Sequence, residues 1–152
     1  MHTLYFEDFF VGQTFITRAG TMSAGDISDF ALKYDPQPMH IDAHSAAEGM
    51  FGGIIASGLH SFAFSLRLFL DLGLTMKSNI VGPGVDELRW IAPVYPGDTI
   101  HSVVEIVESK PSRSKPDRGS IRLKFITRNQ HDDVVMTYTS GMILRRRPAD
   151  AP

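Results

Sequence analysis

Hydrophobic and polar residues alternate along much of the second half of the chain. The alternation is found in four segments, residues 85–90, 99–109, 120–129 and 134–146. A period of two places successive side chains on opposite faces of a strand. The short turn sequences YPGD and NQHDD, and one longer polar connection, separate these segments. The pattern therefore predicts four strands that pair in an antiparallel sheet.

The first half of the chain has helical spacing instead. Ser23 and Asp26 resemble a capping box at the start of a helix that should end at Pro36. Asp42 is a suitable N-cap for a second, brief helix. Residues 59–70 are apolar on nearly every side, which is typical of a buried helix. The first half therefore predicts two short helices and one long buried helix.

One long buried helix followed by several strands predicts an α+β domain. With a short strand at 14–18, the sheet would have about five or six strands and would wrap around the helix, which is the hotdog fold. We expect residues 1–152 to form a single domain, with about 146–152 as a frayed tail. This arrangement leaves an edge strand and one end of the helix poorly covered. A homodimer or a higher homo-oligomer is therefore expected.

Composition and charge argue against several classes of protein. The chain has 152 residues, of which 43% are hydrophobic and 21% are charged, and its formal net charge is -2. This balance argues against a general nucleic-acid binder, and no apolar run approaches the roughly 20 residues that cross a bilayer. We therefore expect a cytoplasmic protein without nucleic-acid or membrane partners. The absence of cysteine excludes disulfides, thiolate nucleophiles and Cys-ligated zinc.

The segment YDPQPMHID, residues 34–42, carries the candidate chemistry. Asp35 and His40 are five residues apart, which is a poor spacing for a helical pair. One interpretation is an ordinary Asp-Pro turn with His40 as a satisfied polar residue. A second is a metal site formed by His40, Asp42 and His44 in an H-x-D-x-H sequence. Because Asp42 is better used as a helix cap, which would turn His44 away, we expect no metal.

A third interpretation makes Asp35 and His40 an acid-base pair. Pro36 and Pro38 restrict the path of the segment that carries them, and such a pair needs rigid positions. Histidine titrates near neutral pH, and a neighbouring carboxylate stays ionised unless it is desolvated. Together the two groups can position and deprotonate a water molecule.

Ser57 and Gly58 precede the long apolar helix. The free N–H groups of a helix N-terminus, helped by the helix dipole, suit an oxygen that gains negative charge. Gly58 would let a substrate approach its N–H closely. The alternative is that Ser57 caps the helix and Gly58 relieves crowding. The G-x-S-x-G sequence is absent, so an acyl-enzyme at Ser57 is not expected.

With these residues, the chain resembles the MaoC-like dehydratases, the group that includes the R-specific enoyl-CoA hydratases. Their motif reads Asp, any residue, Asn, Pro, an aliphatic residue and His, and residues 35–40 occupy it here. Gln37 replaces the Asn, and Tyr34 replaces the usual Gly. The resemblance continues through Ser57 and Gly58 and through the sequence LRWIAPVYPGDTI, and it covers nearly the whole chain.

This resemblance implies a hotdog fold and an acyl-CoA thioester as the substrate. It also implies reversible hydration of a trans-2-enoyl-CoA. Asp35 and His40 would hold the water that attacks Cβ, and the Gly58 N–H would form the oxyanion hole for the thioester oxygen. No metal or organic cofactor is required, because coenzyme A enters as part of the substrate.

Several apolar side chains are candidates for an acyl pocket, although a Phe-rich helix that faces a sheet is more often core. We expect Ser57, Phe51 and Ile55 to bind substrate. The further candidates are Ile54, Phe62, Phe64, Met76 and Trp90.

Two other functions remain open. A hotdog thioesterase would need an acid or amide on the long helix, where Asp71, near the end, is the only acid. A non-catalytic acyl-CoA-binding subunit would bind the thioester without turning it over. The basic loop 110–118 either contacts the phosphates of coenzyme A or is a solvated connection between strands.

Overall fold

The computed structural model describes residues 2–149 of the chain. Its helices are η1 (Phe6–Asp8), α1 (Ala24–Tyr34), α2 (Pro38–Ile41), α3 (Ala43–Glu48) and α4 (Gly58–Leu70). Its strands are β1 (Thr14–Ile16), β2 (Gly20–Thr21), β3 (Asn79–Val81), β4 (Val85–Trp90), β5 (Thr99–Pro111), β6 (Arg118–Arg128) and β7 (Val134–Arg145). The four predicted strands of the second half are β4 to β7, so that prediction is confirmed.

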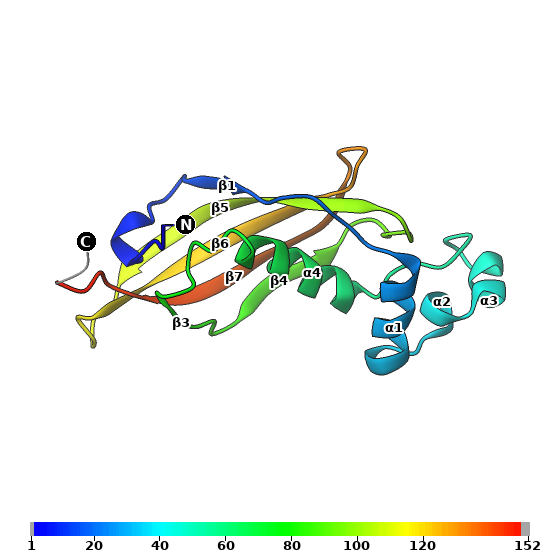
Figure 1. Cartoon of the computed structure of the whole chain (residues 1–152), viewed down its shortest axis with the longest axis horizontal. Helices are drawn as coiled ribbons and strands as arrows, with labels where there is room; N and C mark the ends of the chain where they lie inside the picture. The colour runs from blue at the N-terminus through cyan, green and yellow to red at the C-terminus, as the bar shows by residue number, and fades with distance from the viewer. Residues whose placement is uncertain (1, 150–152) are drawn as a thin grey trace.

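The seven strands form one antiparallel sheet. Their order is β1-β5-β6-β7-β3, with β2 beside β5 and β4 beside β7 (Figure 1). The sheet has more strands than predicted because β2 and β3 contain only two and three residues, which is too short for a period to show. Since α4 packs against this sheet, the prediction of an α+β hotdog fold is confirmed.

The long helix α4 is buried along one face. Its buried residues are Ser61, Ser65, Leu68 and Phe69. On the other side, Leu59 and Leu70 are 48% and 37% exposed. The prediction that this helix is buried on all sides is therefore wrong for the single chain, because the sheet covers only one side of it.

A cluster of hydroxyl groups lies between α4 and the sheet. Ser65 Oγ lies 2.9 Å from Ser102 Oγ, 3.0 Å from Thr127 Oγ1 and 3.1 Å from the Tyr138 hydroxyl. These partners come from β5, β6 and β7. Burial raises the pKa of the Tyr138 phenol well above its ordinary value, so this group stays neutral. Because buried polar groups need partners, the cluster ties the helix to the three central strands.

The short helices α1, α2 and α3 lie at one end of the sheet, next to the N-terminus of α4 (Figure 1). The Ser23 side chain accepts a hydrogen bond from the Asp26 N–H at 3.1 Å. Asp42 Oδ1 accepts hydrogen bonds from the backbone N–H groups that open α3, both at 3.1 Å. Both predicted N-caps are therefore confirmed. Within residues 2–149, no helix has the length and apolar content needed to cross a bilayer.

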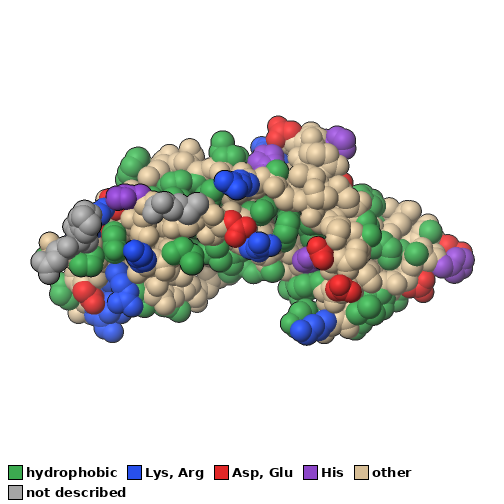
Figure 2. Space-filling model, in the orientation of Figure 1, with side chains coloured by type: hydrophobic (Ala, Val, Ile, Leu, Met, Phe, Trp, Pro, Cys, Tyr) green, Lys and Arg blue, Asp and Glu red, His purple; other side chains and the backbone are tan. Residues whose placement is uncertain are grey.

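The two ends of the described chain meet at the opposite end of the sheet. Arg147 Nη2 donates to both carboxylate oxygens of Asp8, at 2.9 and 2.7 Å. Arg147 thus has a partner at the start of the predicted frayed tail, 146–152, and residues 150–152 lie outside the described residues. The basic loop 110–118 lies at this same end, far from α1 to α3 (Figure 1). Several Lys and Arg side chains gather at this end in Figure 2.

Candidate active site

Two prolines determine where Asp35 and His40 lie. Asp35 is the C-cap of α1, and a residue before a proline is disfavoured in helical conformation, so α1 ends before Pro36. Pro38 occupies the first turn of α2, where the missing N–H of proline costs nothing. His40 therefore lies on a four-residue helix rather than on an extended segment. One proline ends a helix and the other begins the next, and this places the two side chains together.

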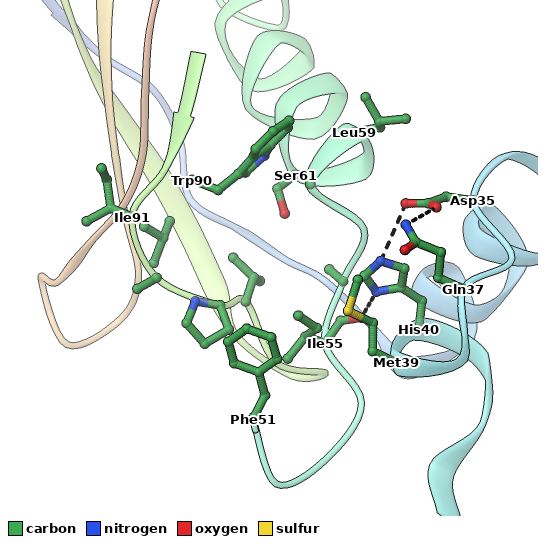
Figure 3. A pocket seen from close by; sticks show the side chains of 16 residues that line it. Asp35, Gln37, Met39, His40, Phe51, Ile55, Leu59, Ser61, Trp90 and Ile91 are labelled. Carbon is green, nitrogen blue, oxygen red and sulfur yellow. Dashed lines mark hydrogen bonds and ion pairs between the residues drawn. The ribbon is translucent and has the colours of Figure 1, made fainter. Parts of the chain in front are cut away.

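The imidazole of His40 is held by two contacts (Figure 3). Nδ1 lies 2.7 Å from the carbonyl oxygen of Ile55, and since a carbonyl only accepts, Nδ1 carries a proton. Nε2 lies 3.4 Å from Oδ2 of Asp35. The His40 side chain is 3% exposed. The orientation of the ring is therefore fixed, and Nε2 is the nitrogen that faces the carboxylate.

Asp35 receives a hydrogen bond on each carboxylate oxygen. The Ser57 hydroxyl donates to Oδ2 at 2.7 Å, and the Gln37 amide donates to Oδ1 at 2.7 Å. The Ser57 bond, followed by the Gln37 bond, lowers the pKa of Asp35, while burial opposes this shift and His40 adds to it. Hydrogen bonds to a carboxylate favour its charged form. Asp35 is therefore ionised at neutral pH.

Ser57 lies at the N-cap position of α4, but its side chain does not cap the helix. It is completely buried and bonds to Asp35 instead. The alternative in which the Ser57 hydroxyl serves as a helix cap is therefore wrong. Ser57 is also not among the residues that line the adjoining cavity. The structure places it behind Asp35, whereas the sequence suggested that it would touch substrate.

Gly58 is the first residue of α4 and lies at the surface of the cavity. Within residues 2–149, its N–H forms no backbone hydrogen bond. The first N–H groups of a helix have no partner inside the helix and carry its positive end. The Gly58 N–H is therefore a donor without a backbone partner, on the same cavity that Asp35 and His40 line.

A cavity of about 600 Å³ opens beside Asp35 and His40. Figure 3 shows Asp35, Gln37 and His40 on one side of it and Trp90 with Ile91 on the other. The predicted pocket residues that line it are Phe51, Ile55 and Trp90. The other candidates lie elsewhere: Ile54, Phe62 and Phe64 pack against the core, and Met76 is 73% exposed. The cavity therefore has mainly apolar walls with a polar group of side chains on one side.

The indole of Trp90 packs directly against Gly58. A methyl group at Gly58 would lie 2.3 Å from Cε2 of the ring, a separation shorter than atoms tolerate. Gly58 therefore allows Trp90 to lie against the N-terminal turn of α4 and to close that side of the cavity. Sequence reasoning included Trp90 only as one of several pocket candidates and missed this contact.

The H-x-D-x-H sequence does not form a cluster of ligands. Asp42 Oδ1 is occupied by two N–H groups of α3, and His44 lies 3.9 Å from Glu48, one turn further along that helix. Among residues 2–149, no group of three or more His, Cys, Asp or Glu could hold a metal ion.

Sequence reasoning also missed two partners within the site. Gln37 was noted only as a departure from a motif, yet its position two residues after Asp35 brings its amide within reach of the carboxylate. The carbonyl of Ile55 fixes the ring of His40. No local signal reveals this second contact, because it depends on how the segment before α4 packs against α2.

The fold and the site together define an α+β hotdog protein with a carboxylate and an imidazole beside an apolar cavity. A sequence profile described as MaoC like domain matches residues 9–129. A MaoC-like dehydratase from Rhodospirillum rubrum, whose crystal structure is known, is 37% identical in sequence to this chain. It superimposes with a TM-score of 0.87 over 95% of this chain and 99% of that chain.

Two further relatives extend this comparison. The uncharacterized protein YdeM from Bacillus subtilis is 34% identical over 140 residues, which are 92% of this chain and 98% of that protein. The 3-hydroxybutyryl-CoA dehydratase from Methylorubrum extorquens is 32% identical over 120 residues, 76% of this chain and 71% of that protein. The chain belongs to the MaoC-like family. The predicted family and the predicted enzyme class, hydro-lyase, are thereby confirmed.

Proposed function

We propose that the protein catalyses the reversible addition of water to the double bond of a trans-2-enoyl-CoA. The observation that carries this proposal is the pair formed by Asp35 and His40, in which Nε2 lies 3.4 Å from Oδ2 at the edge of the cavity. The apolar walls suit an acyl chain, and the Gly58 N–H suits a thioester oxygen. The relationship to a 3-hydroxybutyryl-CoA dehydratase supports a coenzyme A thioester as the substrate.

In the proposed mechanism, Asp35 and His40 hold one water molecule above the double bond. The water oxygen attacks Cβ and gives one proton to the pair. The pair delivers a proton to Cα on the same face. One hydroxyl and one hydrogen are then added across the double bond, and the pair returns to its starting protonation state. The reverse sequence removes water from a 3-hydroxyacyl-CoA.

Gly58 would stabilise the charge that develops during attack. As the water oxygen approaches Cβ, the thioester oxygen gains enolate character, and a free N–H at a helix N-terminus is well suited to hold it. Losing one donor of this kind typically costs about 3 kcal/mol of barrier. No metal or organic cofactor takes part in this scheme, and coenzyme A enters only as part of the substrate.

The thioesterase alternative has less support from the geometry. Asp71 is the C-cap of α4, at the end of the helix opposite Gly58, and lies 3.6 Å from Arg67. It does not line the cavity. The acid that does face the cavity, Asp35, is paired with an imidazole instead. This arrangement favours addition of water to the double bond over hydrolysis of the thioester.

We also propose that the protein forms a homodimer or a higher homo-oligomer. Among residues 2–149, β4 pairs only with β7, and Val85 on β4 and Val81 on β3 carry exposed apolar side chains. An uncovered edge strand of this kind favours association with a second copy. Within one chain, loop 110–118 lies at the end of the sheet away from α1 to α3 (Figure 1). Its cations would reach the phosphates of bound coenzyme A only from a partner copy.

Incubation of the purified protein with crotonyl-CoA tests the proposed function. Loss of the ultraviolet absorbance of the enoyl thioester without release of free thiol would support hydration. Release of thiol would instead support a thioesterase. Binding of the thioester with neither change would support the non-catalytic acyl-CoA-binding subunit and contradict the proposal.

A further inference from the structure

The lining of the cavity consists mainly of apolar side chains. Within the described residues, Asp35 and His40 are its titratable members, and neither Lys nor Arg lines it. The amide of Gln37 already donates to Asp35, and the remaining polar side-chain groups are the hydroxyl of Ser61 and the indole N–H of Trp90. A second carboxylate on the acyl group would lose its hydration here and lie near Asp35 without a cation to pair with.

A β-bulge in β4 determines which side chain of this strand faces the cavity. Val85 lies opposite Ser140 on β7, but Trp90 lies opposite Met136, so β4 uses one residue more than β7 over this stretch. Glu87 has a φ of 53°, a left-handed conformation that is uncommon for residues other than glycine. One extra residue exchanges the faces of all side chains that follow it.

The bulge turns Trp90, which stays 51% exposed, to the face that borders the cavity, and turns Arg89 to the opposite face. Residues directly opposite each other in antiparallel strands share a face, and Met136, the partner of Trp90, is completely buried. Arg89 lies opposite Thr137 on the other face, where its guanidinium is 2.9 Å from Glu87 Oε2. Without the extra residue, Arg89 would take the inward position. The wall of the cavity therefore carries the indole of Trp90, whereas the preceding residue of the same strand, Arg89, would have placed a guanidinium there.

On the basis of the proposed function, we propose that the site selects thioesters of uncharged acyl groups. Trp90, positioned by the bulge at Glu87, is the residue that excludes an acyl group with a second carboxylate. The indole lies against Gly58, beside the expected thioester site, and covers the wall with apolar surface. A cation at position 90 would provide the missing partner for such a carboxylate.

Isothermal titration of the full chain with butyryl-CoA and succinyl-CoA tests this proposal. The two thioesters have the same acyl carbon number and differ in a terminal methyl group against a carboxylate. Neither has a double bond to hydrate, so binding is measured independently of turnover. We expect wild type to bind butyryl-CoA at least about tenfold more tightly than succinyl-CoA. We expect Trp90→Arg to reduce this ratio at least about fivefold, because it adds a cation to the wall.

Two further variants make the test specific. Ile91 lines the same wall, so Ile91→Arg should also reduce the ratio and replaces Trp90→Arg if that variant does not fold. Val11→Arg adds the same charge at an exposed turn before β1, outside the cavity lining, and should leave the ratio unchanged. Equal affinity of wild type for both thioesters, or an unchanged ratio in the folded wall variants, would overturn the inference. If wild type hydrates crotonyl-CoA but binds butyryl-CoA and succinyl-CoA equally well, only this inference is overturned. If wild type binds neither thioester, the proposed substrate is overturned as well.

Discussion

The hydroxyl of Ser57 lies 2.7 Å from Oδ2 of Asp35, although the two residues are 22 positions apart. The same carboxylate oxygen lies 3.4 Å from Nε2 of His40. Ser57 therefore supports the carboxylate from behind while the imidazole faces it from the side. The residue at the N-cap position of the long helix lowers the pKa of Asp35 instead of capping the helix.

Ser57→Ala should move the acid limb of the pH profile of kcat/KM to higher pH. The Ser57 hydroxyl is the largest cause of the lowered pKa of Asp35, so its removal raises that pKa towards the ordinary value. The carboxylate is then protonated at a higher pH, and hydration is lost earlier as the pH falls. The measurement is the pH dependence of crotonyl-CoA hydration. An acid limb that does not move would contradict the role of Ser57.

The lowered pKa of Asp35 also predicts how this residue affects the stability of the fold at different pH values. A carboxyl group whose pKa is lower in the folded protein than in the unfolded chain stabilises the fold above its unfolded pKa. This contribution is lost as the pH falls through the folded pKa. The difference in unfolding free energy between wild type and Asp35→Asn should therefore shrink as the pH falls towards that range. Urea unfolding at a series of pH values measures it, and a difference that grows on acidification would contradict the assigned shift.

Gln37→Glu should impair hydration more than the nearly isosteric Gln37→Met. The amide of Gln37 donates to Oδ1 of Asp35 at 2.7 Å. The methionine removes this donor, whereas the glutamate also places a second negative charge beside the carboxylate and raises the pKa of Asp35 further. The acid limb should therefore lie at the highest pH in Gln37→Glu. Equal profiles for the two variants would show that this contact does not influence the acid.

Gly58→Ala should reduce hydration at least about tenfold, because the added methyl group displaces the Trp90 ring and crowds the thioester site. A double-mutant cycle with Trp90→Ala isolates the contact between the two residues. Removing the indole should recover part of the stability lost in Gly58→Ala, as measured by urea unfolding. Strictly additive effects on stability would contradict the contact.

Ser65→Ala should destabilise the fold by about 1–3 kcal/mol, because it leaves the buried Tyr138 hydroxyl without its partner. Ser102 and Thr127 remain paired with each other at 2.9 Å. The lost stability should therefore come mainly from the contact between α4 and β7. Ser114→Ala, in an exposed loop, is the matched control. A Ser65→Ala variant as stable as this control would show that the hydroxyl cluster contributes little.

Much of the fold could be predicted because its signals are local and long. The strands β5 to β7 contain 13, 11 and 12 residues, which is enough for a period of two to show. The N-caps Ser23 and Asp42 were likewise visible in a few residues. The short strands β2 and β3 could not be predicted because two or three residues carry no period. The exposure of one side of α4 could not be predicted either, because it depends on which side of the helix the sheet covers, and the sequence of the helix does not indicate this.

The parts of the candidate site that lie close together in the sequence were predictable. Asp35, His40 and the two prolines lie in one segment, and the prolines indicate a fixed path. By contrast, the bonds from Ser57 to Asp35 and from His40 to Ile55 join separate segments. The inward position of Trp90 depends on a single left-handed residue, Glu87, because one extra residue reverses the faces of a strand. Glutamate gives no local signal for that conformation.

The rate of crotonyl-CoA hydration in wild type, Asp35→Asn and His40→Ala tests the central claim most directly. Asp35→Asn removes the negative charge with little change in shape, and His40→Ala removes the second group of the pair. We predict that each variant stays folded and that its kcat/KM is at least about 100-fold lower than that of wild type. Circular dichroism and size-exclusion chromatography confirm the fold and the assembly state. Hydration at close to the wild-type rate in both folded variants would contradict the account.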